Sequence, residues 1–293
     1  MTNFLKYVVR FLRRWFVIDI FLKKRFLKKR YKTEIDFLQK KIRPSSERKS
    51  IVFFTMHKTA SCYVGDVIKK IAWSDGLLAL DFTAYFFDLI KESEGLNRIA
   101  KDKSIFVQNG CFFGPFRRFY EPFRDNIDKY DIILMLRDPR DVLVSQYYSF
   151  SFKHRFPIVA SYKELKKEKE KRKLIADMGV DNYVLHCLDS GSLDIYREYA
   201  DVLLGRDNVL FLRYEDMYDN FDLWLSSISD FFDFSDESVL EDIKKRHNEK
   251  RFDLRRGAKQ VLKGDYKEKL RGDTIKKLNE ECEDVLKIFG FSK

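Results

Sequence analysis

The amino-acid sequence predicts an α/β protein built on a parallel β-sheet of the phosphate-loop type, with helices on both faces in three layers. Continuous apolar runs, which are typical of strands buried on both faces, alternate with helical or loop-like stretches. The first apolar run leads through a short polar turn into a segment with helical spacing. With 293 residues, 45% of them hydrophobic, the chain can bury the core of such a domain.

The individual elements follow from these patterns. Strands are predicted at Ile51–Phe54, Ile105–Val107, Ile132–Leu136 and Val209–Leu212, with a further strand ending near Leu80. A helix is predicted after the first strand because one helical face collects Val64, Val67, Ile68 and Ile71. The alternating charges of residues 163–173 predict a solvated helix or a mobile surface segment. The sequence contains no internal repeat.

A linker signal, IRPSSERKS, ends at Ser50 and divides the chain into two predicted parts. Residues 50–293 form the folded domain, and residues 1–49 form a basic amphipathic, helical N-terminal extension. This extension has no uncharged run near the roughly 20 residues that a membrane-spanning helix needs, and no signal-peptide cleavage site. Two interpretations stay open: the helix packs its aromatic face on the domain, or it rests on an anionic membrane.

The formal net charge of +11 predicts an anionic partner: a nucleic acid, a phosphorylated nucleotide, an acidic glycan or a membrane surface. The four cysteines, Cys62, Cys111, Cys187 and Cys282, are too scattered to predict a metal site or a disulfide framework. We therefore expect a reducing, cytoplasmic setting, with a peripheral place on the inner face of the membrane if the extension binds lipid.

The turn after the first strand carries the first group of candidate binding residues: His57, Lys58, Thr59, Ala60, Ser61 and Cys62. In an open α/β sheet this turn and the N-terminus of the next helix form a natural phosphate site. The glycines of the loop G-x-x-x-x-G-K-[ST] are missing, which counts against a kinase or ATPase. Lys58 could neutralise a bridging phosphate oxygen, and the hydroxyls of Thr59 and Ser61 with nearby amides could hold a terminal phosphate.

The second group lies in the segment RDPRDVLVS, residues 137–145. Asp138 suits the N-cap of a helix and Pro139 its first position, so Arg137 should stand at the carboxyl end of a strand beside Lys58. Ser145, two helical turns on, could contact the same anion. The alternative is an ion pair between Arg137 and Asp141, with Ser145 incidental.

From about Ile51 to the C-terminus the chain resembles the sulfotransferases that use 3′-phosphoadenosine 5′-phosphosulfate (PAPS). The resemblance rests on the strand and Lys-Thr loop at residues 51–62 and on the stretch RDPRDVLVSQYYSF. It implies that residues 57–62 bind the 5′-phosphosulfate and that Arg137 and Ser145 grip the 3′-phosphate. The product would be 3′,5′-adenosine bisphosphate (PAP), and no metal is expected.

Two further segments extend the resemblance. Leu212–Asp216 looks like the Tyr-Glu-Asp segment of the family, which makes Tyr214 a candidate cofactor-binding residue, although a strand end with a helix cap explains it equally well. A loop-like stretch containing Arg255, Arg256 and Gly257, followed by residues 263–267, looks like the family's C-terminal basic loop that closes on the 3′-phosphate. The spacing between these two pieces is longer than the usual pattern.

Sulfuryl transfer resembles phosphoryl transfer in placing negative charge on the leaving phosphate's bridging oxygen, so a cation there is the main requirement. Lys58 is the candidate. Many family members carry a histidine after the third strand as general base, whereas this chain has Gln108, Asn109 and Gly110. Asp81, after the second strand, and His154 are the other candidates. A capping or solvated role for Asp81 and a packing role for His154 are the alternatives.

The acceptor is expected to carry a hydroxyl or an amine, and a carbohydrate or glycolipid is favoured. The aromatic stretch FFGPFRRFYEPF, residues 112–123, is expected to shape its pocket, because aromatic rings offer flat surfaces to sugars. Two other functions compete: a phosphate-loop kinase, and a basic membrane-surface or nucleic-acid-binding module without catalysis. Binding of PAP discriminates, because a surface module would not bind it. No nucleic-acid partner is expected for the enzyme.

Overall fold

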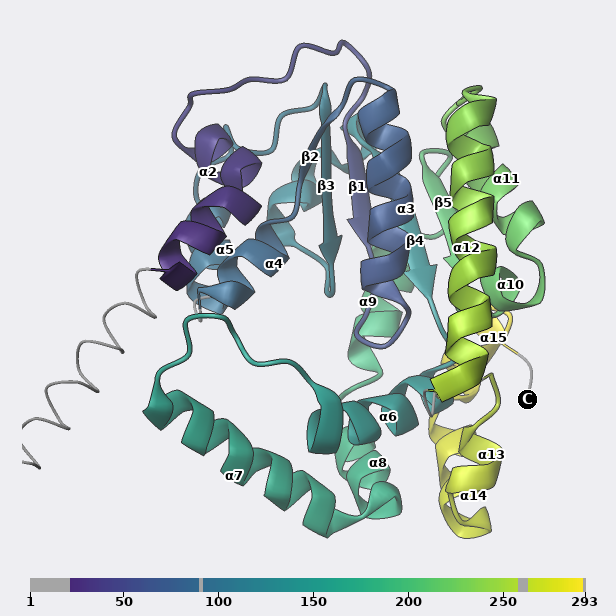
Figure 1. Ribbon diagram of the computed structural model, residues 1–293. Helices are drawn as coiled ribbons and strands as arrows, with labels where there is room; N and C mark the ends of the chain where they lie inside the picture. Colours follow the sequence, from purple (N-terminus) through teal and green to yellow (C-terminus); the bar gives the residue numbers. More distant parts are fainter. Residues whose placement is uncertain (1–21, 90–91, 258–262, 292–293) are drawn as a thin grey trace, which may run out of the picture.

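The computed structural model describes residues 22–89, 92–257 and 263–291, with side chains described except at residue 92 and residues 250–257. Its centre is a five-stranded parallel sheet with the strand order β2-β3-β1-β4-β5 (Figure 1). The strands are β1 (Ile51–Phe54), β2 (Leu78–Leu80), β3 (Cys111–Phe116), β4 (Asp131–Leu136) and β5 (Val209–Arg213). Because all neighbours are parallel, the carboxyl ends of all five strands lie at one edge of the sheet. The α/β prediction is confirmed.

Helices cover both faces of this sheet. They are α2 (Lys32–Leu38), α3 (Ser61–Ser74), α4 (Phe82–Asp88), α5 (Glu92–Ala100), η1 (Glu121–Lys129), α6 (Pro139–Tyr148), η2 (Ser149–Lys153), α7 (Tyr162–Met178), α8 (Val180–Asp189), α9 (Asp194–Leu203), α10 (Tyr214–Asp219), α11 (Phe221–Phe231), α12 (Glu237–Gly257), α13 (Tyr266–Lys269), α14 (Gly272–Glu281) and α15 (Glu283–Ile288).

Alternate side chains of the central strand, β1, are buried in two separate hydrophobic cores, one on each face of the sheet. Ile51 and Phe53 of β1 pack with residues of α3, α11 and α12 on one face. Val52 and Phe54 face the opposite core, which α4, η1, α8, α9 and the C-terminal helices complete. The predicted helix after β1 is confirmed as α3, which buries the four predicted apolar residues. Both faces of the sheet are thereby kept from water, which explains the continuous apolar runs in the sequence.

The strand prediction is wrong at Ile105–Val107. These residues form no strand, although Phe106 is buried in the aromatic core. The strand lies instead at Cys111–Phe116, where it pairs with β1 on one side and β2 on the other. Gly114 and Pro115 within it are residues that ordinarily argue against a central strand. The sequence of residues 105–107, which form no strand, therefore matches the usual pattern of a strand better than the sequence of β3 does.

The aromatic stretch 112–123 was also misassigned. Its rings belong to the hydrophobic core rather than to a pocket, and the buried members are Phe112, Phe113, Phe116, Phe119, Tyr120 and Phe123. The Phe123 ring lies within 5.6 Å of the Phe106 and Phe116 ring centroids, which shows a tightly packed cluster. Because all six rings are buried, they offer little exposed surface to an acceptor in this structure.

The charged segment 163–173 is confirmed as a solvated helix. It lies in α7, which buries none of its residues and begins with a capping box between Ser161 and Glu164. Figure 1 shows α7 running along the edge of the molecule, connected to η2 by a long loop. This helix and loop together frame one side of the region below the carboxyl ends of the strands.

The N-terminal extension is described only from residue 22 onward, and residues 1–21 lie outside the described part. Residues 22–30 are helical and continue through Tyr31 into α2. Leu27, Tyr31 and Phe37 are buried against the domain, and the Tyr31 hydroxyl donates a hydrogen bond of 2.5 Å to Asp88. For these residues packing on the domain is what the structure shows. Within the described ranges, no helix combines the length and apolar character required to cross a membrane.

Candidate active site

The loop between β1 and α3 has a backbone conformation suited to an anion. Lys58 and Ala60 both have positive φ values, 72° and 57°, so the peptide planes alternate in orientation around Thr59. Successive amides in such alternating conformations form concave anion sites. Thr59 is fully buried, and its hydroxyl donates a 2.8 Å hydrogen bond to the Met56 carbonyl and lies 2.5 Å from the Thr55 hydroxyl. The Thr59 side chain therefore fastens the loop from inside, which was not expected.

The amides of this loop are available to a ligand. Among the described residues, none accepts a hydrogen bond from the backbone N–H groups of residues 58–62. These residues include the first turn of α3, where the helix dipole adds partial positive charge. Of the predicted loop residues, Ser61 is buried at the helix start and Cys62 is exposed. The prediction that residues 57–62 form a phosphate-binding loop fits this geometry.

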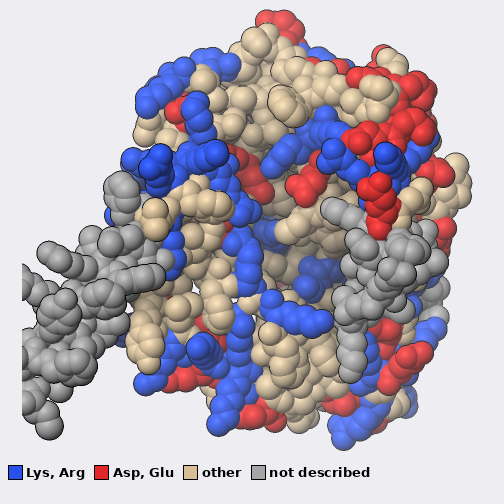
Figure 2. Space-filling model, in the orientation of Figure 1, with Lys and Arg blue, Asp and Glu red and all other residues tan. Residues whose placement is uncertain are grey.

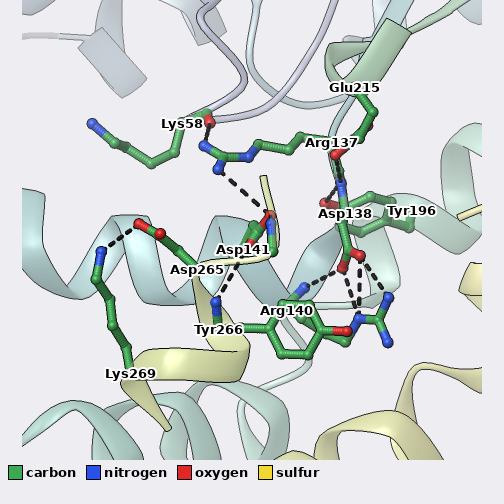
Figure 3. A network of polar contacts seen from close by, with 11 residues as sticks. Lys58, Arg137, Asp138, Arg140, Asp141, Tyr196, Glu215, Asp265, Tyr266 and Lys269 are labelled. Atoms are coloured by element: carbon green, nitrogen blue, oxygen red, sulfur yellow. Dashed lines mark hydrogen bonds and ion pairs between the residues drawn. The ribbon is translucent and has the colours of Figure 1, made fainter. Parts of the chain in front are cut away.

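Arg137 stands at the end of β4 directly beside the loop. Its guanidinium donates to the Lys58 carbonyl over 3.2 Å and lies 3.6 Å from the Asp141 carboxylate (Figure 3). The same guanidinium lies over the Tyr214 ring, 4.4 Å from its centroid. Both ionic side chains are almost fully buried, with exposed fractions of 3% for Arg137 and 1% for Asp141. The alternative ion pair thus exists, and it holds Arg137 next to Lys58.

The start of α6 confirms the predicted cap. The Asp138 carboxylate accepts a 2.9 Å hydrogen bond from the Arg140 amide, and Pro139 occupies the first turn. Ser145, on the same helix, is buried. The Asp138 amide donates in turn to Glu215 at 3.0 Å, and burial raises the pKa of Glu215 to about 7. Glu215 was not among the predicted site residues, and it links the end of β5 to the start of α6.

Asp141 connects the C-terminal loop to the same place. Its carboxylate accepts hydrogen bonds from the Gly264 amide at 2.7 Å and the Tyr266 amide at 3.2 Å (Figure 3). Residues 263–267, predicted as part of a closing basic loop, thus lie beside Arg137. Arg255, Arg256 and Gly257 fall at the end of α12 rather than in a loop. Their side chains lie outside the described residues, and their cofactor role stays a prediction.

Positive charge accumulates in this region. Burial lowers the pKa of Lys58, and the charge of Arg137 lowers it further, with smaller effects from Lys153 and Arg117. Burial likewise lowers the pKa of His57 to about 3, with Arg117 as the next cause, so its imidazole is neutral at pH 7. Figure 2 shows a hollow in the middle of this face with Lys and Arg surface inside it. Such a concentration of cations favours an anionic ligand.

Arg117 was missed by the sequence interpretation because β3 was misplaced. It follows β3 directly, and its guanidinium lies 3.6 Å from the Cys62 sulfur. Gln108, Asn109 and Gly110 precede β3, so comparing them with the histidine after the family's third strand was wrong. Placing the strand at Cys111–Phe116 would have identified Arg117 as the residue at its carboxyl end.

The two candidate bases lie in different settings. Asp81 is the N-cap of α4 and accepts a 2.9 Å hydrogen bond from the Ala84 amide, which is the capping role considered as its alternative. Burial raises the pKa of this carboxyl. His154 follows η2, and burial and then the charge of Lys58 lower its pKa. The His154 imidazole is therefore neutral at pH 7, whereas the Asp81 carboxylate is held by its cap.

An α/β sheet whose strand ends gather cations and free amides offers a site for a phosphorylated anion. The family model described as sulfotransferase domain matches residues 121–290, which is more than half of the chain. The chain therefore belongs to the sulfotransferase domain family and is an enzyme of sulfuryl transfer, as the sequence resemblance predicted. Within the described residues, no group of three or more His, Cys, Asp or Glu side chains is arranged to hold a metal ion.

Solved structures of other proteins are similar to this one, and one with a TM-score above 0.5 supports the fold. Mouse sulfotransferase SULT7A1 complexed with PAP has a TM-score of 0.54 and 15% identity, covering 85% of this chain and 92% of that one. Retinol dehydratase in a complex with retinol and PAP has a TM-score of 0.46 and 14% identity, covering 88% and 86%. A sulfotransferase from Alicyclobacillus acidocaldarius has a TM-score of 0.43 and 15% identity, covering 85% and 94%. No curated protein sequence matches the chain.

Proposed function

We propose that this protein transfers the sulfuryl group of PAPS to a hydroxyl or amine of an acceptor. One observation carries the proposal. Three cationic side chains, Lys58, Arg117 and Arg137, lie at the carboxyl ends of β1, β3 and β4, close to the unpartnered amides of residues 58–62. These groups suit a ligand with two separate phosphate-like anions. The PAP bound in the mouse sulfotransferase supports the same class of donor.

The donor is proposed to lie across the strand ends. Its 5′-phosphosulfate would sit on His57, Lys58, Thr59, Ala60, Ser61 and Cys62. Its 3′-phosphate would sit at Arg137 and Ser145, with Tyr214 supporting the Arg137 guanidinium and residues 263–267 closing over it. PAP is then the released product.

The reaction follows from this placement. The acceptor oxygen forms a bond to sulfur while the bond between sulfur and the bridging phosphate oxygen breaks. Lys58 would neutralise the charge that develops on the departing phosphate, and His154 would accept the proton of the acceptor hydroxyl. The products are a sulfate ester and PAP. Asp81, which is tied up in its cap, is the weaker candidate for the proton transfer.

Calorimetric titration with PAP tests the donor assignment. We expect micromolar binding by the wild type and a loss of affinity of at least about 100-fold in Arg137→Ala, because a buried charge-assisted contact to the phosphate would be removed. Arg124→Ala, which removes an exposed arginine far in the chain from the loop, is the matched control and should bind normally. A folded wild type that does not bind PAP would refute the proposal and leave a basic surface module as the better account.

The acceptor is proposed to be a carbohydrate or glycolipid. The N-terminal part, residues 1–49, is proposed to act as an extension of the domain at 50–293, with its described end packed on that domain. Exposed Leu22 and Phe26 (56% and 52% exposed) stand on a helical segment rich in Lys and Arg, which suits an anionic membrane surface. Cosedimentation with vesicles containing phosphatidylserine, compared with phosphatidylcholine alone, measures this contact. Equal, weak binding to both kinds of vesicle would count against it.

A further inference from the structure

A cavity of about 370 Å³ lies between α7 and the segment that follows η2. Three aromatic side chains line it, Phe87, Phe150 and Phe156, and its remaining lining includes apolar residues of α7. The cavity is large enough for a small ring-shaped ligand and offers flat apolar surfaces to it. None of the predicted donor-binding residues lines this cavity, so the space is available to a second substrate.

The inner end of the cavity adjoins the candidate active site. His154 and Phe150 both line the cavity, and their ring centroids are 5.3 Å apart. The Phe150 ring lies 6.2 Å from the His57 ring, and His57 is the neighbour of Lys58 in the donor loop. The cavity therefore lies next to the donor loop, with Phe150 between them and with His154, the proposed proton acceptor, in the cavity lining.

Two arginines hold the walls of the cavity in place. Arg155 pairs with the fully buried Asp88 and lies over the Phe87 ring, 4.5 Å from its centroid. Arg172 of α7 donates to the His154 carbonyl and lies 3.8 Å from the Phe156 centroid. Both guanidinium groups already contact protein groups and so shape the cavity, and Arg172 also fixes α7 against it.

Two lysines of α7 remain to face a ligand. Lys167 and Lys171 line the cavity one helical turn apart, and no ion pair is formed by either within the described part of the chain. Glu164 and Glu168 also line the cavity, and the Glu164 carboxylate accepts from the Ser161 amide in the helix cap. With Arg155 balanced by Asp88, the lining still holds Lys167, Lys171 and Arg172 against the two glutamates, so a ligand with an anionic group is favoured.

We propose that this cavity binds the acceptor and that the acceptor is an acidic saccharide, a sugar that carries a carboxylate. Its ring packs on the aromatic side chains, its carboxylate lies at Lys167 and Lys171, and its reacting hydroxyl points toward His154. During transfer the sugar oxygen forms a bond to sulfur while the bond between sulfur and the bridging phosphate oxygen of PAPS breaks, PAP leaves, and the proton of the sugar hydroxyl passes to His154. This inference rests on the proposed sulfuryl transfer and adds the class of acceptor to it.

Binding of two matched glycosides to the PAP-bound protein tests the inference. The probes are 4-nitrophenyl β-glucuronide and 4-nitrophenyl β-glucoside, which differ in a carboxylate. We expect the glucuronide to bind at least about fivefold more tightly, because one additional ionic contact contributes about 1 kcal/mol. The double variant Lys167→Ala/Lys171→Ala should lose this preference while its affinity for the glucoside stays within about twofold.

The control variant is Lys169→Ala/Lys173→Ala, which removes the same charge from α7 at positions that do not line the cavity. It should keep the wild-type preference. Equal affinity of the two glycosides for the wild type, or equal losses in both double variants, would overturn the inference. PAP titration of the same samples separates the two proposals: normal PAP binding without a glucuronide preference rejects the acidic acceptor alone, and absent PAP binding rejects the donor assignment.

Discussion

Lys58→Ala is expected to lower the turnover number for sulfuryl transfer by about 10²–10³-fold, the usual effect of removing a preorganised group that stabilises developing charge. Lys58 lies in the loop that bears the free amides, with Arg137 bound to its carbonyl oxygen. The substitution removes the ammonium group without removing that carbonyl, so the loop and Arg137 should stay in place. PAP affinity is therefore expected to fall much less than turnover does.

The measurement is the rate of PAP formation from PAPS with a saturating acceptor, alongside PAP titration of the same samples. Lys173→Ala, on the solvated helix α7, is the control for loss of a lysine and should turn over at the wild-type rate. A Lys58→Ala enzyme with near-normal turnover would show that another cation, with Arg117 the first candidate, neutralises the leaving phosphate. Equal losses of turnover and of PAP affinity would instead indicate a role in ground-state binding.

Arg140→Ala is expected to lower the free energy of unfolding by about 3–5 kcal/mol, the range for removing one partner of a buried ion pair. Arg140 is 1% exposed and contacts both oxygens of the Asp138 carboxylate, with distances of 2.6–3.2 Å. It also donates to Asn279 at 2.8 Å and lies over the Tyr266 ring, 4.4 Å from its centroid. The variant leaves a buried carboxylate and removes the contacts of α6 with Asn279 and the Tyr266 ring.

Urea unfolding followed by circular dichroism measures this loss. Arg124→Ala is the control, since its ion pairs with Glu121 and Glu198 are exposed and should contribute less than about 1 kcal/mol. If Arg140→Ala were as stable as Arg124→Ala, the buried contacts of Arg140 would not be the main interactions that hold the C-terminal helices against α6. PAP affinity should also fall in Arg140→Ala, because the loop at residues 263–267 is anchored through the same helix.

The parts of the site that the sequence predicted are those that local patterns determine. Asp138 and Pro139 define a helix start within two residues. The continuous apolar runs of β1, β4 and β5 indicate strands by composition alone. Lys58 and Arg137 could be placed together because both follow parallel strands. These predictions needed no knowledge of distant contacts.

The parts that the sequence did not predict depend on contacts between distant segments. β3 contains Gly114 and Pro115, and only its pairing with β1 and β2 identifies it as a strand. Arg117 was missed for the same reason. The hydrogen bonds from the loop at residues 264–266 to Asp141 join segments more than 120 residues apart. Local patterns of charge or periodicity do not reveal such contacts. The fully buried Thr59 hydroxyl shows that a residue in a binding motif can serve the loop's interior instead.

The buried carboxylate of Asp88 joins the N-terminal segment to the wall of the acceptor cavity. It accepts the Tyr31 hydroxyl on one side and pairs with Arg155 on the other. The N-terminal helix and the wall of the proposed acceptor cavity are therefore linked through one buried carboxylate. We expect a change that displaces the N-terminal helix to disturb this wall through Asp88 and Arg155. Replacing the helix would then alter which acceptors are used, even though none of its described residues lines the cavity.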